Sequence, residues 1–145
     1  MAFDLSAPIL IVDDTDTVRR ILVTLVKRIG FTKVDVAPNG MDALFKMKTK
    51  KYGLVISDWQ MEPVDGFALL KTIRSDPELA ATPFIMITLY SDVEKVIAAR
   101  NAGVNAFISK PFTAKMLKEK MMLAWQYQPR QISPLLQDDE SLDVF

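Results

Sequence analysis

Three carboxylates and one lysine stand directly after short apolar runs, and they are the residues of this chain best placed to do chemistry. Asp13 and Asp14 close the first apolar run, Asp58 closes the third, and Lys110 follows the fifth. Such runs are typical of buried parallel strands, whose carboxyl ends meet at one edge of an open α/β sheet. The sequence therefore predicts that these four side chains share one rim.

Three carboxylates on one rim repel each other unless a cation lies among them. Oxygen ligands of this kind suit a hard divalent ion such as Mg²⁺, which keeps several waters and shares its coordination sphere with a phosphate. The ammonium group of Lys110 supplies a second positive charge for an anion. The pattern indicates phosphoryl transfer onto a carboxylate.

Each part of this pattern also has a simpler interpretation. Asp13 and Asp14 are suited to capping the helix that follows them, and Lys110-Pro111 is suited to an ordinary turn after a strand. The occurrence of Asp58 in the same pattern favours the metal-site hypothesis over both alternatives.

The elements that must position these residues alternate between strands and helices. Helical patterns of apolar residues separate five apolar runs, so we expect βαβ units with right-handed crossovers and a doubly wound parallel sheet. The predicted strands are Ile9–Val12, Val34–Ala37, Leu54–Ser57, Phe84–Thr88 and Ala106–Ser109.

Local signals set the expected helix ends. The first helix begins after one of residues 14–16 and ends before Gly30, Asn39-Gly40 opens the second, and Gly66 opens the third. Asp, Asn and Gly are the usual residues at such positions. The fourth helix is expected to end at Gly103.

Length and composition restrict the classes of protein. The 145 residues fit one domain, 18 basic residues balance 18 acidic ones, and the chain contains neither Cys nor His. These counts exclude disulfides, thiolate metal sites and a phosphohistidine on this chain, and they argue against nucleic-acid binding. No apolar run reaches the ~18 residues of a membrane span, and the N-terminus lacks the features of a secretory signal, so a cytoplasmic protein is expected.

The chain changes character near Tyr127. We expect a folded domain over residues 1–127 and a flexible acidic tail over residues 128–145, because the tail contains Pro and clustered acids without apolar periodicity.

At these motifs the chain resembles the receiver domain of bacterial two-component response regulators, most closely the single-domain chemotaxis type. The resemblance covers about residues 8–125. Its motifs are Asp13-Asp14, Ser57-Asp58-Trp59-Gln60-Met61, Asp65-Gly66, Thr88 and Lys110-Pro111-Phe112. It implies an α/β, flavodoxin-like (βα)5 fold with strand order 2-1-3-4-5.

The resemblance also implies a role for each site residue. Asp58 would accept a phosphoryl group from a phosphohistidine, and Mg²⁺ would be held by Asp14, Asp58 and the backbone carbonyl of Gln60. Asp13 would act through a metal-bound water. A carboxylate is ionised at neutral pH and needs no general base, which fits the lack of His.

The remaining implied contacts form a switch. Lys110, after a cis bond to Pro111, and the Thr88 hydroxyl would contact phosphoryl oxygens, and the N–H of Leu89 could add another contact. Thr88 would then move toward the phosphoryl group, and Phe107 would turn inward.

The implied partners are proteins. A sensor histidine kinase or a histidine phosphotransfer protein would supply the phosphoryl group. A downstream target would bind the face made by the fourth helix, the strand 106–109 and the last helix. We expect a stand-alone switch, with no nucleic acid and no membrane as partner and no enzymatic turnover beyond its own phosphorylation and dephosphorylation. The alternatives are a phosphorelay shuttle or phosphate sink, an aspartyl-phosphate phosphatase or phosphotransferase, and a docking module that needs no phosphorylation.

The chain departs from the family pattern at several positions. Phe107 lacks a hydroxyl group that is common there, and Leu89 replaces a small residue, so it could narrow access to Asp58. Glu62-Pro63 reverses the usual order, in which Pro directly follows the Met.

Three further side chains carry expectations about the site. Gln60 and Tyr90 occupy the positions that tune attack by water in this family, and bulky Tyr90 could shield the phosphoryl group. We expect Trp59 to be partly exposed at the rim.

Overall fold

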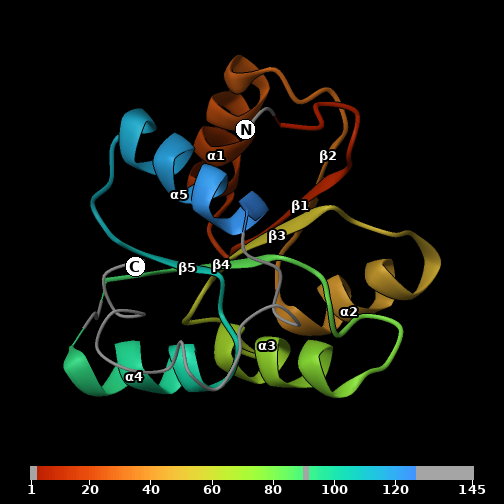
Figure 1. Cartoon of the computed structure of the whole chain (residues 1–145), viewed down its shortest axis with the longest axis vertical. Coiled ribbons are helices and arrows are strands. Elements are labelled where there is room, and N and C mark those ends of the chain that lie inside the picture. The colour runs from red at the N-terminus through yellow and green to blue at the C-terminus, as the bar shows by residue number, and fades with distance from the viewer. Residues whose placement is uncertain (1–2, 90–91, 127–145) are drawn as a thin grey trace.

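The computed structural model describes residues 3–89 and 92–126. Five parallel strands form one sheet in the order β2-β1-β3-β4-β5. Helices α1 and α5 cover one face of this sheet, and α2, α3 and α4 cover the other (Figure 1). The elements are β1 (Ile9–Val12), α1 (Asp16–Ile29), β2 (Val34–Ala37), α2 (Gly40–Thr49), β3 (Leu54–Asp58), α3 (Gly66–Ser75), β4 (Phe84–Thr88), α4 (Val93–Asn101), β5 (Ala106–Ser109) and α5 (Ala114–Gln126).

The structure confirms the predicted fold class and strand order. Four of the five predicted strands have the observed bounds, and β3 is one residue longer than predicted because Asp58 belongs to the strand. All residues of β1, β3 and β4 are buried, as expected for parallel strands covered on both faces.

The register of the strands brings their carboxyl ends together. Val12 lies opposite Ser57, Asp58 opposite Ile87, and Thr88 opposite Ser109. The residues that follow β1, β3, β4 and β5 therefore emerge along one edge of the sheet.

Alternate side chains of the strands point into two separate apolar layers, one on each face of the sheet. Leu10, Val55 and Met86 point toward α2, α3 and α4, whereas Ile11, Ile56 and Ile85 point toward α1 and α5. Apolar side chains of the helices pack into both layers, so β1, β3 and β4 are buried on both faces of the sheet.

Polar caps fix the starts of three helices. The side chains of Asn39, Asp65 and Asp92 accept the N–H groups of Asp42, Ala68 and Lys95, which satisfies a donor that would otherwise be unpaired. Helix α1 differs, since its N-cap is Thr15 and no side-chain cap bond forms there. Gly30 ends α1 with a φ of 127°, a conformation that favours glycine.

A buried guanidinium group joins α3 to the segments on either side of β4. Arg74 donates to the carbonyl oxygens of Ala80, Thr82 and Gly103 and to the side-chain oxygen of Asn105. Burial lowers the pKa of Arg74 to about 10, so the group stays charged at neutral pH. Through its bonds to these four acceptors, Arg74 holds the start of β5 against α3.

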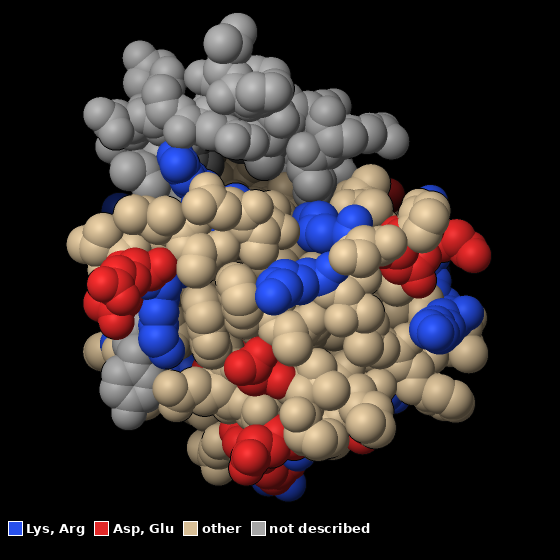
Figure 2. All heavy atoms as spheres, turned by 90° about the horizontal axis from the view of Figure 1, so that it is seen from below, with Lys and Arg blue, Asp and Glu red and all other residues tan. Residues whose placement is uncertain are grey.

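Charged residues of both signs are interspersed on the outer side of α3 and α4 (Figure 2). Within the described ranges, none of the helices is both long and apolar enough to cross a membrane. The tail predicted for residues 128–145 lies outside the described residues.

Candidate functional site

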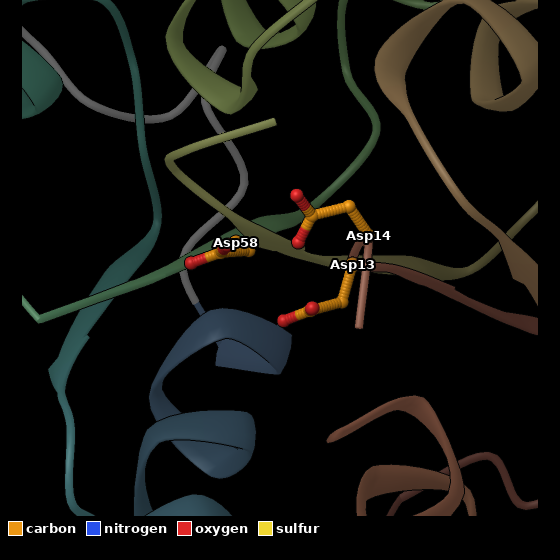
Figure 3. Close-up of side chains that lie close together, drawn as sticks. All are labelled: Asp13, Asp14 and Asp58. Carbon is orange, nitrogen blue, oxygen red and sulfur yellow. The ribbon is translucent and has the colours of Figure 1, made fainter. Parts of the chain in front are cut away.

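The three predicted carboxylates converge at the carboxyl edge of the sheet. Asp13 and Asp14 follow β1 and Asp58 ends β3. Each offers an oxygen within 4.8 Å of the others (Figure 3). Asp13 and Asp58 are 1% and 8% exposed, whereas Asp14 is open to solvent. The cluster is therefore reached from the Asp14 side.

Lys110 completes the predicted rim. Its Nζ lies 3.3 Å from Asp58 Oδ1 and 3.5 Å from Asp13 Oδ2. Its backbone N–H donates to the carbonyl oxygen of Thr88 at 2.8 Å, which ties the β5–α5 loop to β4. The Lys110-Pro111 bond is cis, as predicted.

The backbone around Asp13 is held from three sides. Its N–H donates to Ala37 O at 3.1 Å. Its Oδ1 accepts the N–H of Thr15 at 2.8 Å, and its carbonyl oxygen accepts from Arg19 Nη1 at 2.6 Å. Asp13 is thus fixed with one oxygen toward Lys110. Neither Asp13 nor Asp14 is the N-cap of α1, so the simple capping alternative is wrong.

The charges around Asp58 shift its acidity. Burial, followed by the negative charge of Asp13, raises the pKa of Asp58, and Lys110 only partly opposes this effect. Asp58 therefore carries its charge at an energetic cost that a cation at this edge would relieve. Carboxylate oxygens this close together form a donor set that fits a hard divalent cation.

The loop between β3 and α3 is pinned beside Asp58. Trp59 N–H donates to Ile87 O at 2.9 Å, and Gly66 N–H donates to Trp59 O at 2.8 Å. A methyl group at Gly66 would overlap the carbonyl oxygen of Asp58, so only glycine allows α3 to begin this close to β3. These contacts hold the residues between Trp59 and Gly66 over the site.

An open hollow lies above the carboxylates. Its lining combines predicted residues with neighbours that the sequence did not single out for the site. The lining residues are Asp14, Thr15, Asp58, Gln60, Met61, Glu62, Asp65, Thr88, Leu89 and Lys110. Leu89 lies at this opening with 63% of its surface exposed, where the sequence placed it. Tyr90 lies outside the described residues.

Two residues of the site were not foreseen. Thr15 lines the hollow, and Arg19 braces the Asp13 carbonyl. Arg19 lies one helical turn after Thr15, and this spacing is the only signal in the sequence that could have placed it near the rim.

Of the expected switch residues, Thr88 lines the hollow and Phe107 does not. Thr88 is fully buried and Phe107 is 5% exposed, so Phe107 already occupies an inward position. Its ring packs edge-on against Trp59, at 6.4 Å between ring centroids.

The expectation for Trp59 is wrong. It is 9% exposed, because its ring stacks on Phe67 at 5.1 Å and Lys95 Nζ lies 5.0 Å above it. An aromatic ring and a cation from two different helices thus cover the indole.

Comparison with known proteins agrees with the geometry. The family profile described as the response regulator receiver domain matches residues 9–122. The chemotaxis protein CheY-3 of Vibrio cholerae serotype O1 is 46% identical over 113 residues, which are 78% of this chain and 87% of that protein. The chemotaxis protein CheY of Pseudomonas aeruginosa is 40% identical over 78% of this chain and 91% of its own length.

A solved structure shares the fold. A putative response regulator from Chloroflexus aurantiacus superposes with a TM-score of 0.79 at 30% identity, covering 84% of this chain and 99% of the other. The profile match spans the sheet from β1 to most of α5. The carboxylate cluster, the lysine opposite it and the five-stranded order therefore have one common explanation: this chain belongs to the family of response regulator receiver domains.

Proposed function

We propose that this protein is a signalling switch that is phosphorylated on Asp58 by a phosphohistidine of a sensor histidine kinase or histidine phosphotransfer protein. The observation that carries the proposal is the position of Asp58 at the end of β3, with Lys110 Nζ 3.3 Å from its carboxylate and an open hollow above it. The phosphorylated form would change its contacts with a protein target.

The proposed chemistry needs no general base. Asp58 is a carboxylate whose oxygen attacks phosphorus in line with the leaving nitrogen of the phosphohistidine. The P–N bond breaks as the P–O bond forms, and the imidazole leaves with the electron pair. Lys110 and the Thr88 hydroxyl would donate to phosphoryl oxygens and stabilise their charge.

The acidic cluster fits Mg²⁺ in this proposal. Asp14, Asp58 and the Gln60 carbonyl would hold the ion directly, and Asp13 would act through a water molecule. Bound Mg²⁺ supplies positive charge beside the phosphoryl oxygens. Asp13 is suited to its indirect role, because the N–H of Thr15 and Lys110 already occupy its two oxygens.

The readout would start at Thr88. Movement of Thr88 toward a phosphoryl group would change the space next to Phe107, which packs against Trp59. Trp59 in turn contacts Lys95 of α4. A shift in these contacts would alter the face of α4, β5 and α5, where Val93, Ile97 and Met116 expose apolar surface. We propose that the target belongs to a chemotaxis pathway, because two relatives are named as chemotaxis proteins.

Intact-mass measurement tests the proposal. Wild-type protein incubated with Mg²⁺ and a phosphodonor should gain one phosphoryl group, whereas Asp58→Asn should gain none. Asp42→Asn is the matched control, because it makes the same change on the exposed side of α2 and should label normally. Labelling of Asp58→Asn at the wild-type rate would overturn the assignment. Rapid release of phosphate without accumulation of labelled protein would indicate an enzyme instead.

A further inference from the structure

The hollow above Asp58 carries an excess of negative charge. Four carboxylates line it and only one cationic side chain, Lys110, does so among the described residues. Lys110 is already paired with Asp13 and Asp58. A bound divalent cation would offset two of the four charges, so the approach to the nucleophile stays acidic.

Of the four carboxylates, Glu62 is the one that has no role in the proposed metal site or in capping a helix. Asp14 and Asp58 belong to the metal-binding cluster, and Asp65 caps α3 by accepting the N–H of Ala68. Glu62 lines the hollow as an exposed residue, four positions after Asp58. The hydrogen bond from Gly66 to Trp59 fixes the loop that carries it.

A fixed charge at the entrance acts on any charged reactant. Walls of one sign lower the local concentration of ions of the same sign, and the effect weakens as salt shortens the Debye length, which is about 10 Å at 0.1 M. Small phosphodonors are anions, and they enter the hollow that Glu62 lines in order to reach Asp58. The energy of this repulsion is proportional to the donor's charge.

We infer that Glu62 is a donor-specificity residue, which disfavours free anionic phosphodonors and so reserves Asp58 for a phosphohistidine presented by a protein. A protein surface with basic side chains can neutralise Glu62 on contact, which a free small anion cannot do. This inference rests on the proposed phosphorylation of Asp58. It predicts that the negative charge of Glu62 slows labelling by small donors.

The test compares two small donors of different charge. In the reaction with acetyl phosphate, a P–O bond to Asp58 forms while the donor's P–O bond breaks, and acetate leaves with the electron pair. Acetyl phosphate is a dianion at neutral pH, whereas phosphoramidate has a protonated nitrogen and a net single negative charge. Labelling rates are measured at Mg²⁺ concentrations that saturate the rate of each variant, so that changes in metal affinity do not enter.

Glu62→Gln should raise the second-order rate constant for acetyl phosphate about threefold at low ionic strength, and Glu62→Lys by about the square of that factor. The factor by which the phosphoramidate rate constant rises should be about the square root of the factor for acetyl phosphate, because phosphoramidate carries half the charge. Both effects should shrink in high salt. Glu78→Gln is the control, since it removes the same charge from the opposite end of the sheet and should match wild type.

Other outcomes separate the inference from the proposed function. An unchanged rate in Glu62→Gln and Glu62→Lys, or a gain that is equal for both donors and insensitive to salt, would overturn the role of Glu62 while leaving phosphorylation of Asp58 intact. Failure of wild type and every variant to label, with both small donors and with a phosphohistidine-bearing protein, would overturn the proposed function, and this inference with it.

Discussion

Asp58 is a carboxyl group in an environment that disfavours its own charge. Burial is the main cause that raises its pKa; the charges of Asp13 and, less strongly, Asp14 raise it further, and Lys110 opposes them. The apo protein thus stores electrostatic repulsion at the edge of the sheet. The same repulsion makes the edge attractive to a cation.

Asp58→Asn should therefore stabilise the metal-free protein at pH 7, by about 1 kcal/mol of unfolding free energy. The pKa of Asp58 is raised in the folded state. The loss of stability caused by its charge is therefore fully present above the folded-state pKa, and it is absent below the pKa of about 3.9 that Asp58 has in the unfolded chain. The gain of the variant should disappear as pH falls through this window. Thermal unfolding in a chelator at several pH values measures it, and a lower melting temperature at pH 7 would contradict the prediction.

Leu89 lies at the opening above Asp58. It is 63% exposed and lines the hollow beside Thr88. Leu89→Ala should speed both labelling by small donors and loss of the phosphoryl group severalfold, because it opens space without removing a charge or a backbone donor. Mg²⁺ affinity should change little. Stopped-flow measurement of both rates tests this prediction. The control is Leu5→Ala, which makes the same change at an exposed residue near the start of the chain.

The side chains that do the proposed chemistry were predictable, and the ones that brace them were not. Acidic residues after apolar runs are visible in a sequence, because strand ends place them together. Burial of Trp59 depends on Phe67 and Lys95, which come from helices whose relative positions no local pattern reveals. Arg19 binds a backbone carbonyl, and such a partner leaves no trace in residue types.

The start of α3 lies unusually close to β3. Gly66 N–H donates to Trp59 O, and any Cβ at position 66 would meet the Asp58 carbonyl oxygen and approach Met86 Sδ to 2.9 Å. The backbone of Asp58 and the first turn of α3 are therefore in direct contact.

Gly66→Ala should push α3 away from β3 and cost about 2 kcal/mol or more of stability. Because the clash is with the backbone of Asp58, labelling should slow as well. Ala68→Gly, at an exposed site in the first turn of α3, is the control and should cost only the ~1 kcal/mol of helix propensity. Denaturant unfolding and labelling rates measure the two effects; equal stability of Gly66→Ala and wild type would contradict the steric account.

Strands were easier to predict than helix starts. Apolar runs set the strand bounds to within one residue, because β1, β3 and β4 are buried along their whole length. At α1 several residues could cap, and the structure selects Thr15 without any side-chain cap bond, since Asp13 turns its oxygens to Thr15 N–H and Lys110 instead. Tertiary contacts decided that boundary.

The two ends of the described chain meet at the amino edge of the sheet. Phe3 and Phe31 each lie within 6 Å of the Trp125 ring, with centroid distances of 5.7 and 5.6 Å. Trp125 is therefore part of the folded domain, and the boundary near residue 127 stays a prediction.

Removal of residues 128–145 should leave the melting temperature and the labelling of Asp58 unchanged. A second truncation that also removes Trp125 should cost about 3 kcal/mol or more, because it empties an aromatic site. Differential scanning calorimetry of both proteins tests the boundary. A large loss in the shorter deletion would show that the tail contributes to the domain.

The order of the strands came from the resemblance to a family and not from the residues alone. Apolar runs alternating with helices indicate a parallel sheet, but they leave open which strand lies beside which. The order β2-β1-β3-β4-β5 places β1 beside β3, and this pairing brings Asp13 and Asp58 together.

The chain has two tryptophans, and the sheet separates them. Trp59 follows Asp58 at the carboxyl edge, whereas Trp125 lines a hollow with Ala7, Gly53 and Pro83 at the amino edge. The molecule thus contains two intrinsic fluorophores at opposite edges of the sheet. Replacing Trp125 with Phe would leave an emission spectrum that reports events near Asp58. Replacing Trp59 would leave one that reports whether Trp125 stays packed against Phe3 and Phe31. Ion binding and global unfolding could therefore be followed separately in unlabelled protein.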